Sequence, residues 1–155
     1  MNGSIPTITK IPKIAKYLND IGVSEPIRER IEVVHSHIQK IIPSTIEDIF
    51  IVDYLEEDGT RVYQDMDFYS DKRLVSAMDF KRTVDIRTAS ILKIAFVQFL
   101  SKDYDFQLAN SKSRLTVNFS VEYSDTIGGQ LKATSQNCDY LMKIVQKYFI
   151  PRLKE

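Results

Sequence analysis

The spacing of apolar residues changes near Thr45, and this change constrains the fold more than any other feature. Before Thr45, large aliphatic residues recur every three or four positions, as they do along one face of a helix. After it, apolar and polar residues tend to alternate, which is the period of a half-buried strand. Helical spacing returns at the end of the chain. Helices, then strands, then one more helix indicate a mixed α+β protein.

A helical hairpin is predicted over residues 10–43, after a loose arm at 1–9 that has no clear period. The first helix ends at Gly22, and the second is capped by Ser24 and runs until Pro43. The apolar seam of the second helix consists of Ile27, Ile31, Val34, Ile38 and Ile41. We expect this seam to mediate association. Two surfaces can cover it: the chain's own sheet, or the same seam of a second copy, which would form a homodimer.

An antiparallel meander of about six or seven strands is predicted after the hairpin, followed by a C-terminal helix from Asn137 to Phe149. Asp58-Gly59 indicates a type I′ turn, because both residue types tolerate a positive φ. One segment, 91–100, fits either a helix face or a buried strand, and its β-branched residues favour the strand. The strands are expected at 46–55, 61–69, 74–80, 82–88, 91–100, 114–123 and 130–135, and a turn at 101–105 could bring 91–100 back against 106–109.

This order of elements resembles that of pleckstrin-homology-like barrels, and the resemblance implies a sheet curved into a barrel. It covers the order of the elements only. The whole chain, 1–155, is expected to form one domain, because no flexible linker, repeat or low-complexity run divides it. Residues 45–150 would supply the sheet and the last helix, with the helical hairpin as an extension.

Charge is segregated along the chain, although 21 basic and 21 acidic residues balance overall. The zero net charge disfavours a nucleic-acid partner, which needs a broad basic field. Residues 47–71 hold nine acids and one base, and we predict an exposed acidic hairpin that binds a partner through Asp53, Glu56, Asp65 and Asp67. A basic cluster that fits an acidic partner or an anionic head group is formed by Lys72, Arg73, Lys81, Arg82 and Arg87.

The sequence contains no catalytic or metal-binding pattern that stands above background. His35 and His37 are two positions apart on a predicted helix, so they project in different directions and cannot chelate one metal together. Cys138 is the single cysteine and is interpreted as a small apolar filler. Gly128-Gly129-Gln130 resembles the tripeptide of class I peptide release factors, but a turn between two strands explains the glycines more simply. We therefore expect no catalytic residue, no metal and no cofactor.

The location expected from the sequence is the cytoplasm. A lone cysteine cannot form an intramolecular disulfide, and lysines interrupt every apolar stretch near the N-terminus before it reaches signal-peptide length. The longest apolar segment is about half of what a bilayer-crossing helix needs, so no transmembrane association is expected.

Two functions are compatible with these features. The first is a non-enzymatic protein-interaction or regulatory module with a protein partner. The alternative is a small-ligand or lipid-head-group binding protein, with a pocket between the curved sheet and the last helix lined by Tyr104, Phe106 and Tyr123. A cavity of several hundred cubic ångströms (about 300 Å³ or more) would favour the ligand, whereas a filled barrel would favour the interaction module.

Overall fold

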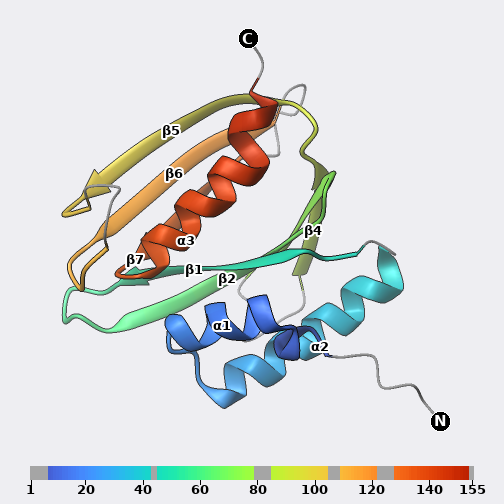
Figure 1. The fold of residues 1–155 in the computed structure, drawn as a ribbon, viewed down its shortest axis with the longest axis horizontal. Helices are drawn as coiled ribbons and strands as arrows, with labels where there is room; N and C mark the ends of the chain where they lie inside the picture. The colour runs from blue at the N-terminus through green and yellow to red at the C-terminus, as the bar shows by residue number, and fades with distance from the viewer. Residues whose placement is uncertain (1–6, 43–44, 79–84, 105–108, 122–127, 154–155) are drawn as a thin grey trace.

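The helices and strands follow the change of period, as seen in a computed structural model that describes residues 7–42, 45–78, 85–104, 109–121 and 128–153. A mixed α+β fold results (Figure 1). Its elements are η1 (Ile8–Lys10), α1 (Pro12–Asp20), α2 (Glu25–Ile41), β1 (Asp48–Leu55), β2 (Arg61–Tyr69), β3 (Arg73–Met78), β4 (Asp85–Ser90), β5 (Ile94–Lys102), β6 (Arg114–Val121), β7 (Gly128–Thr134), α3 (Asn137–Ile144), the π-helical turn η2 (Val145–Phe149) and the 3₁₀ turn η3 (Ile150–Arg152).

The described strands form two antiparallel sheets, one ordered β1-β2-β3-β4 and the other β5-β6-β7. β1 lies against β7, but within the described ranges no ladder of backbone hydrogen bonds joins them. The sheets do not close, so the pleckstrin-homology-like barrel is not confirmed. The ambiguous segment 91–100 contributes to β5, which confirms its interpretation as a strand. Residues 106–108, in the segment expected against 91–100, lie outside the described residues.

The turn between β1 and β2 differs from the predicted type I′ turn. Gly59 has a φ of 88°, but the positive-φ residues other than glycine in the described chain are Asp103 and Ser135. The Gly59 amide donates to the Glu56 carbonyl at 2.9 Å, and the Glu56 amide donates to the Thr60 carbonyl at 2.9 Å. These bonds define a three-residue loop with a glycine bulge, in which only the glycine needs a positive φ.

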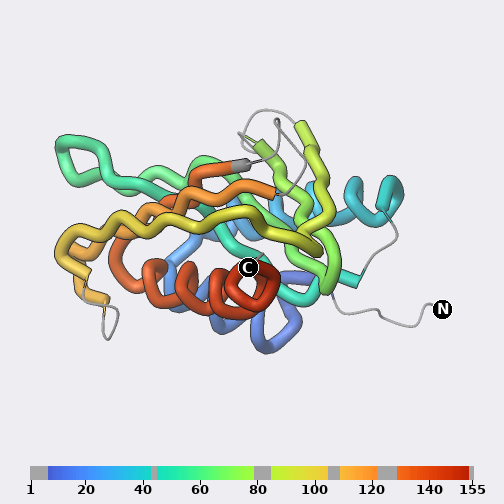
Figure 2. The backbone as a smooth tube through the Cα atoms, turned by 90° about the horizontal axis from the view of Figure 1, so that it is seen from above, coloured from blue at the N-terminus to red at the C-terminus, as the bar shows by residue number. Residues whose placement is uncertain are grey.

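The helices lie on two sides of β1, with α1 and α2 below it in Figure 1 and α3 above it. α3 runs along the three-stranded sheet, and the turn η2 continues it toward the other sheet (Figure 2). Tyr148 of η2 stacks on Tyr69 of β2, with ring centroids 4.8 Å apart. The next residue, Phe149, stacks on Phe119 of β6 at 4.6 Å. Two consecutive aromatic residues therefore join the two sheets.

The apolar seam of α2 packs inside the chain. Ile31, Val34 and Ile38 are fully buried in the hydrophobic core, and Ile27 is partly buried against it. Ile41 is the exception, with 65% of its surface exposed. Most of the predicted association seam is thus already buried in the protein's own core.

The described end of the predicted loose arm is bound to α2. Ile8 belongs to the hydrophobic core, and the backbone amide of Thr9 donates to Glu32 Oε2 at 2.9 Å. The expectation of a loose arm is therefore wrong for residues 7–9, because a buried isoleucine and a carboxylate acceptor hold them.

The corner where β1 meets β7 is organised by Asp53, whose side chain is 0% exposed. Its carboxylate accepts hydrogen bonds from Arg61 Nε at 2.6 Å, from the Thr134 amide at 3.1 Å and from Asn137 Nδ2 at 2.8 Å. The Thr134 hydroxyl also donates to it. The expectation that Asp53 lies on an exposed acidic surface is therefore wrong: it joins β1, β2, β7 and α3 inside the protein.

Beside this corner, side chains occupy the edge of β1 that β7 would otherwise pair with. Tyr17 Oη accepts from the Ile51 amide at 2.8 Å and donates to Asn137 Oδ1 at 2.8 Å. Asn137 Nδ2 donates to the Ile51 carbonyl at 2.8 Å. Both backbone groups of Ile51 are satisfied by α1 and α3, which explains why the two sheets remain separate at this point.

Removing the carboxylate at the corner should destabilise the protein. Asp53→Ala leaves the Arg61 guanidinium and the Thr134 amide without their buried acceptor, and we expect the free energy of unfolding to fall by about 3–5 kcal/mol. Glu56→Ala removes an exposed acid from the same hairpin and should change it by less than about 0.5 kcal/mol. Urea unfolding of both variants measures the difference, and equal effects would contradict the assigned role of Asp53.

Removing the helical hairpin should expose the face of the first sheet that carries Met66 and Phe68, both fully buried. We expect a chain that begins at Thr45 to aggregate or lose its fixed tertiary structure, as measured by light scattering and near-UV circular dichroism. Ile41→Ser in the full chain is the control for an exposed seam position. A shortened chain that stays folded and monomeric would contradict this covering role of the helical hairpin.

Candidate functional site

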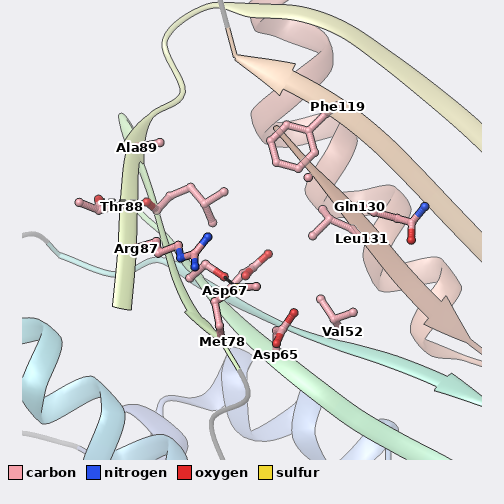
Figure 3. A pocket seen from close by; sticks show the side chains of 13 residues that line it. Val52, Asp65, Asp67, Met78, Arg87, Thr88, Ala89, Phe119, Gln130 and Leu131 are labelled. Carbon is pink, nitrogen blue, oxygen red and sulfur yellow. Dashed lines mark hydrogen bonds between the residues drawn. The ribbon is translucent and has the colours of Figure 1, made fainter. Parts of the chain in front are cut away.

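A pocket lies between β2, β3 and β4 of one sheet and β6 and β7 of the other (Figure 3). Its volume is about 150 Å³. We call it the inter-sheet pocket, and it is lined by Val52, Asp65, Asp67, Leu74, Ser76, Met78, Arg87, Thr88, Ala89, Phe119, Gly129, Gln130 and Leu131. One wall carries two acids, an arginine and a serine, and the other is mainly apolar.

Strand register brings the polar groups to one face. Asp67 of β2 lies opposite Ser76 of β3, which in turn lies opposite Arg87 of β4. Directly opposed residues of antiparallel strands share a face, and Asp65 shares it because it lies two positions before Asp67. The structure therefore unites Asp65 and Asp67 of the predicted acidic hairpin with Arg87 of the predicted basic cluster.

Asp67 is the buried member of this wall, with 2% of its surface exposed. Burial and, to a smaller extent, the charge of Asp65 raise its pKa, hydrogen bonds with Ser76 and Tyr69 oppose the rise, and the resulting pKa is about 7. The Tyr69 hydroxyl donates to Asp67 Oδ2 at 3.3 Å. The expectation of an exposed Asp67 is wrong, and this carboxyl exchanges its proton near neutral pH.

The facing wall depends on a glycine in β7. An added Cβ at Gly129 would lie 3.1 Å from the Phe119 ring, so the ring would have to shift by a few tenths of an ångström to accept a side chain there. Gln130 Nε2 donates to Asn118 Oδ1 at 3.1 Å on the outer face of the sheet. The turn interpretation of Gly128-Gly129-Gln130 is wrong: these residues begin a strand, and the second glycine makes room for an aromatic ring.

The other predicted site residues lie apart from the pocket. Glu56 is exposed at the end of the β1–β2 hairpin. Lys72 and Arg73 are exposed, but Arg73 belongs to the face opposite Arg87, because it lies two positions before Val75, which pairs with Thr88. The basic cluster is therefore split between two faces. Its remaining members, Lys81 and Arg82, lie outside the described residues.

Two of the aromatic residues expected to line a ligand pocket lie outside the described residues: Phe106 and Tyr123. The third, Tyr104, is buried, and its hydroxyl donates to Asp139 Oδ1 of α3 at 3.0 Å. It supports the last helix and does not line the inter-sheet pocket.

The cysteine and the histidines do not form a reactive group. Burial raises the pKa of the Cys138 thiol to about 12, so the reactive thiolate is not populated at neutral pH. The His35 ring packs against Phe68 of β2, with centroids 6.1 Å apart, while His37 is exposed. In the part of the chain that the structure describes, no three His, Cys, Asp or Glu side chains are grouped so that they could hold a metal ion.

None of the described helices is both long enough and apolar enough to span a membrane.

No protein-family model matches this chain, and no curated protein matches it. Among solved structures, the chain is similar to the C-terminal domain of an unknown protein from Leishmania infantum. The TM-score is 0.47 at 10% sequence identity, over 75% of this chain and 94% of that one.

The buried Asp67 should make stability depend on pH. Its pKa is about 7 in the folded protein and about 4 in the unfolded chain. The folded state therefore holds the proton more tightly, and the stability that this contributes is complete below about pH 4 and is lost as the pH rises through 7. Asp67→Asn stays neutral, so between pH 5 and 8 it should gain about 3 kcal/mol of unfolding free energy relative to the wild type.

Urea unfolding at pH 5, 6, 7 and 8 measures this relative gain. Asp103→Asn is the matched control, because Asp103 is exposed and asparagine also tolerates its positive φ of 55°. Parallel pH profiles for wild type and Asp67→Asn would contradict the raised pKa.

Proposed function

We propose that this protein binds a compact small molecule in the inter-sheet pocket. The observation that carries the proposal is a buried carboxyl, Asp67, on the wall of a largely apolar cavity. Ligand sites commonly combine apolar walls with a few convergent polar groups that fix the orientation of the ligand. Ionisation of a carboxyl at such a depth is unfavourable unless a partner meets it, and a ligand is one such partner.

The volume limits the ligand to about one ring or a short chain. An apolar cavity of about 150 Å³ is large enough for benzene, and the inter-sheet pocket has about that volume. It is well below the volume expected for a drug-sized molecule and below the several hundred cubic ångströms that would by itself favour a ligand, so the proposal rests on the buried Asp67 and not on the volume. A pocket of this size does not favour a lipid, so we do not propose a lipid head group as its ligand.

The charges favour a ligand with a cationic or hydrogen-bond-donating group. Asp65 and Asp67 face Arg87, whose side chain is 69% exposed and lies 3.7 Å from Asp85. An ammonium group next to Asp67 would stabilise the ionised carboxylate and offset the unfavourable effect of burial. The apolar part of the ligand would then lie on Phe119 and Leu131, on the opposite wall.

We propose binding without catalysis. The carboxyl of Asp67 is of a type that acts as a general base, but the described residues that line the inter-sheet pocket include no histidine, cysteine or lysine to act beside it as a strong nucleophile. We also propose a cytoplasmic location, because the sequence has a lone cysteine and lysines interrupt the apolar stretches near its N-terminus.

A second candidate is the protein-interaction module expected from the sequence, and the edge strand β5 favours it. β5 pairs with β6, and its other edge has an isolated bridge between Ile94 and Leu153 among the described residues. Phe96 and Leu100 are 48% and 52% exposed on this strand. A protein partner that adds a strand would pair with the edge and cover both side chains.

Ligand binding is tested with benzylamine, benzyl alcohol and benzoate, which share a ring and differ in charge. We expect benzylamine to bind most tightly, with a Kd of about 1 mM, and benzoate least. Benzylamine binding should tighten between pH 6 and 8 as Asp67 ionises. NMR titration of the backbone amides of Gly129 and Leu131 measures both the affinity and the place of binding.

Asp67→Asn should remove the preference for benzylamine over benzyl alcohol without abolishing binding of the alcohol. Asp103→Asn, which keeps the pocket intact, should bind all three compounds as the wild type does. Equal affinity of the wild type for benzylamine and benzoate would refute the role of Asp67, and no shifts with any compound would refute the pocket.

A further inference from the structure

A second pocket lies between α1 and α3, beside the start of β1. Its volume is about 230 Å³. Lysines of both helical segments surround it, and its floor is formed by aliphatic and tyrosine side chains. We call it the lysine groove and define it by Lys13, Lys16, Lys143 and Lys147, with Ile14, Tyr17, Ile49, Tyr140 and Ile144 beneath them.

Helical geometry places these lysines together. Lys13 and Lys16 are three positions apart on α1, and Lys143 and Lys147 are four positions apart on α3 and its continuation η2. Both spacings put side chains on one face of a helix. The helices meet where Tyr17 packs edge-on against Tyr140, with ring centroids 4.6 Å apart.

The lysines are held in place by acids, but the cations outnumber the acids. Asp48 forms ion pairs with Lys13 and, at 2.8 Å, with Lys147. Lys16 pairs with Asp20 at 2.7 Å. Glu47 lies 3.9 Å from Lys147 and is a third acid nearby, so four lysines face three carboxylates. Each ammonium has three N–H donors, more than these pairs use, which leaves donors for another anion.

The fourth lysine lies over an aromatic ring. Lys143 Nζ is 4.8 Å from the centroid of Tyr140, on the same ring that borders the apolar floor. A positive charge thus stands directly beside apolar surface. This juxtaposition suits a ligand that has an anionic end and an apolar body.

We propose that the lysine groove binds a compact organic anion, of which a medium-chain carboxylate is the representative. The carboxylate would accept hydrogen bonds from Lys16 and Lys143, and the apolar body would lie on Ile14 and Ile144. The groove is larger in volume than the inter-sheet pocket, is lined by other residues and carries the opposite charge, so this site is independent of the proposed amine site.

The test compares octanoate, octan-1-ol and octylamine, which share a chain and differ in charge. We expect octanoate to bind at least about tenfold more tightly than either of the others, with shifts of the Ile14 and Ile144 methyl signals in NMR titration. Its affinity should fall as NaCl is raised, because exposed lysines are screened by salt. Equal affinities for octanoate and octan-1-ol would overturn the proposal.

The matched variants are Lys16→Gln/Lys143→Gln and Lys102→Gln/Lys112→Gln. Both remove two exposed charges, and neither removes Lys13 or Lys147, which hold the buried Asp48. The first should weaken octanoate binding about fivefold to tenfold, and the second should leave it unchanged. Equal weakening in the two variants would show a general charge effect and overturn the site.

Two further measurements separate the alternatives. Asp67→Asn should bind octanoate as the wild type does, so failure of the inter-sheet pocket does not affect this result. Vesicles that contain phosphatidylglycerol test a membrane surface in place of a free anion. If the protein sediments with such vesicles but does not bind octanoate, the proposal is overturned and the lysine groove is a membrane-binding surface.

Discussion

The buried carboxylate of Asp53 is the constraint on which the rest of the structure depends. A charge taken out of water is tolerated only when hydrogen-bond donors surround it, and these donors come from β2, β7 and α3. Satisfying one side chain therefore fixes three elements around β1. Because Tyr17 and Asn137 then occupy the edge of β1 at Ile51, β7 does not extend the first sheet there. The space between the two sheets is the inter-sheet pocket.

Asp53 and Asp67 are buried acids of the same hairpin, but they differ in how well hydrogen-bond donors satisfy their carboxyl groups. This difference distinguishes a structural acid from a candidate ligand contact. Asp53 is ion-paired to Arg61 and accepts several strong hydrogen bonds. Asp67 has the Tyr69 hydroxyl at 3.3 Å and a pKa near 7, and it borders a cavity. A carboxyl with well-placed partners serves stability, whereas one whose pKa is shifted by burial beside a cavity is the better candidate for ligand contact.

The local patterns predicted much of the fold, and the long-range contacts explain what they missed. The period of three and four residues placed α2, and alternation placed β2 over the residues that form it. The acids of β1 and β2 were assigned to an exposed surface because alternation alone does not distinguish a solvent face from a second buried face. The continuous apolar run 49–52, together with Arg61 as the single base of the segment, was the available signal for burial on both faces. The lysines of α1 and those of α3 are far apart in the sequence, so no local pattern predicted that they would lie together.

The π-helical turn η2 has a mechanical consequence. In a regular α-helix, neighbouring side chains diverge by about 100°, and one wider turn changes where they point. Here Tyr148 stacks on Tyr69 of one sheet, and Phe149 stacks on Phe119 of the other. The two sheets are thus held together at one end, and whichever sheet the last helix follows, widening the gap between them separates at least one of the two ring stacks. The two aromatic residues thus fix the spacing of the sheets at this end of the molecule.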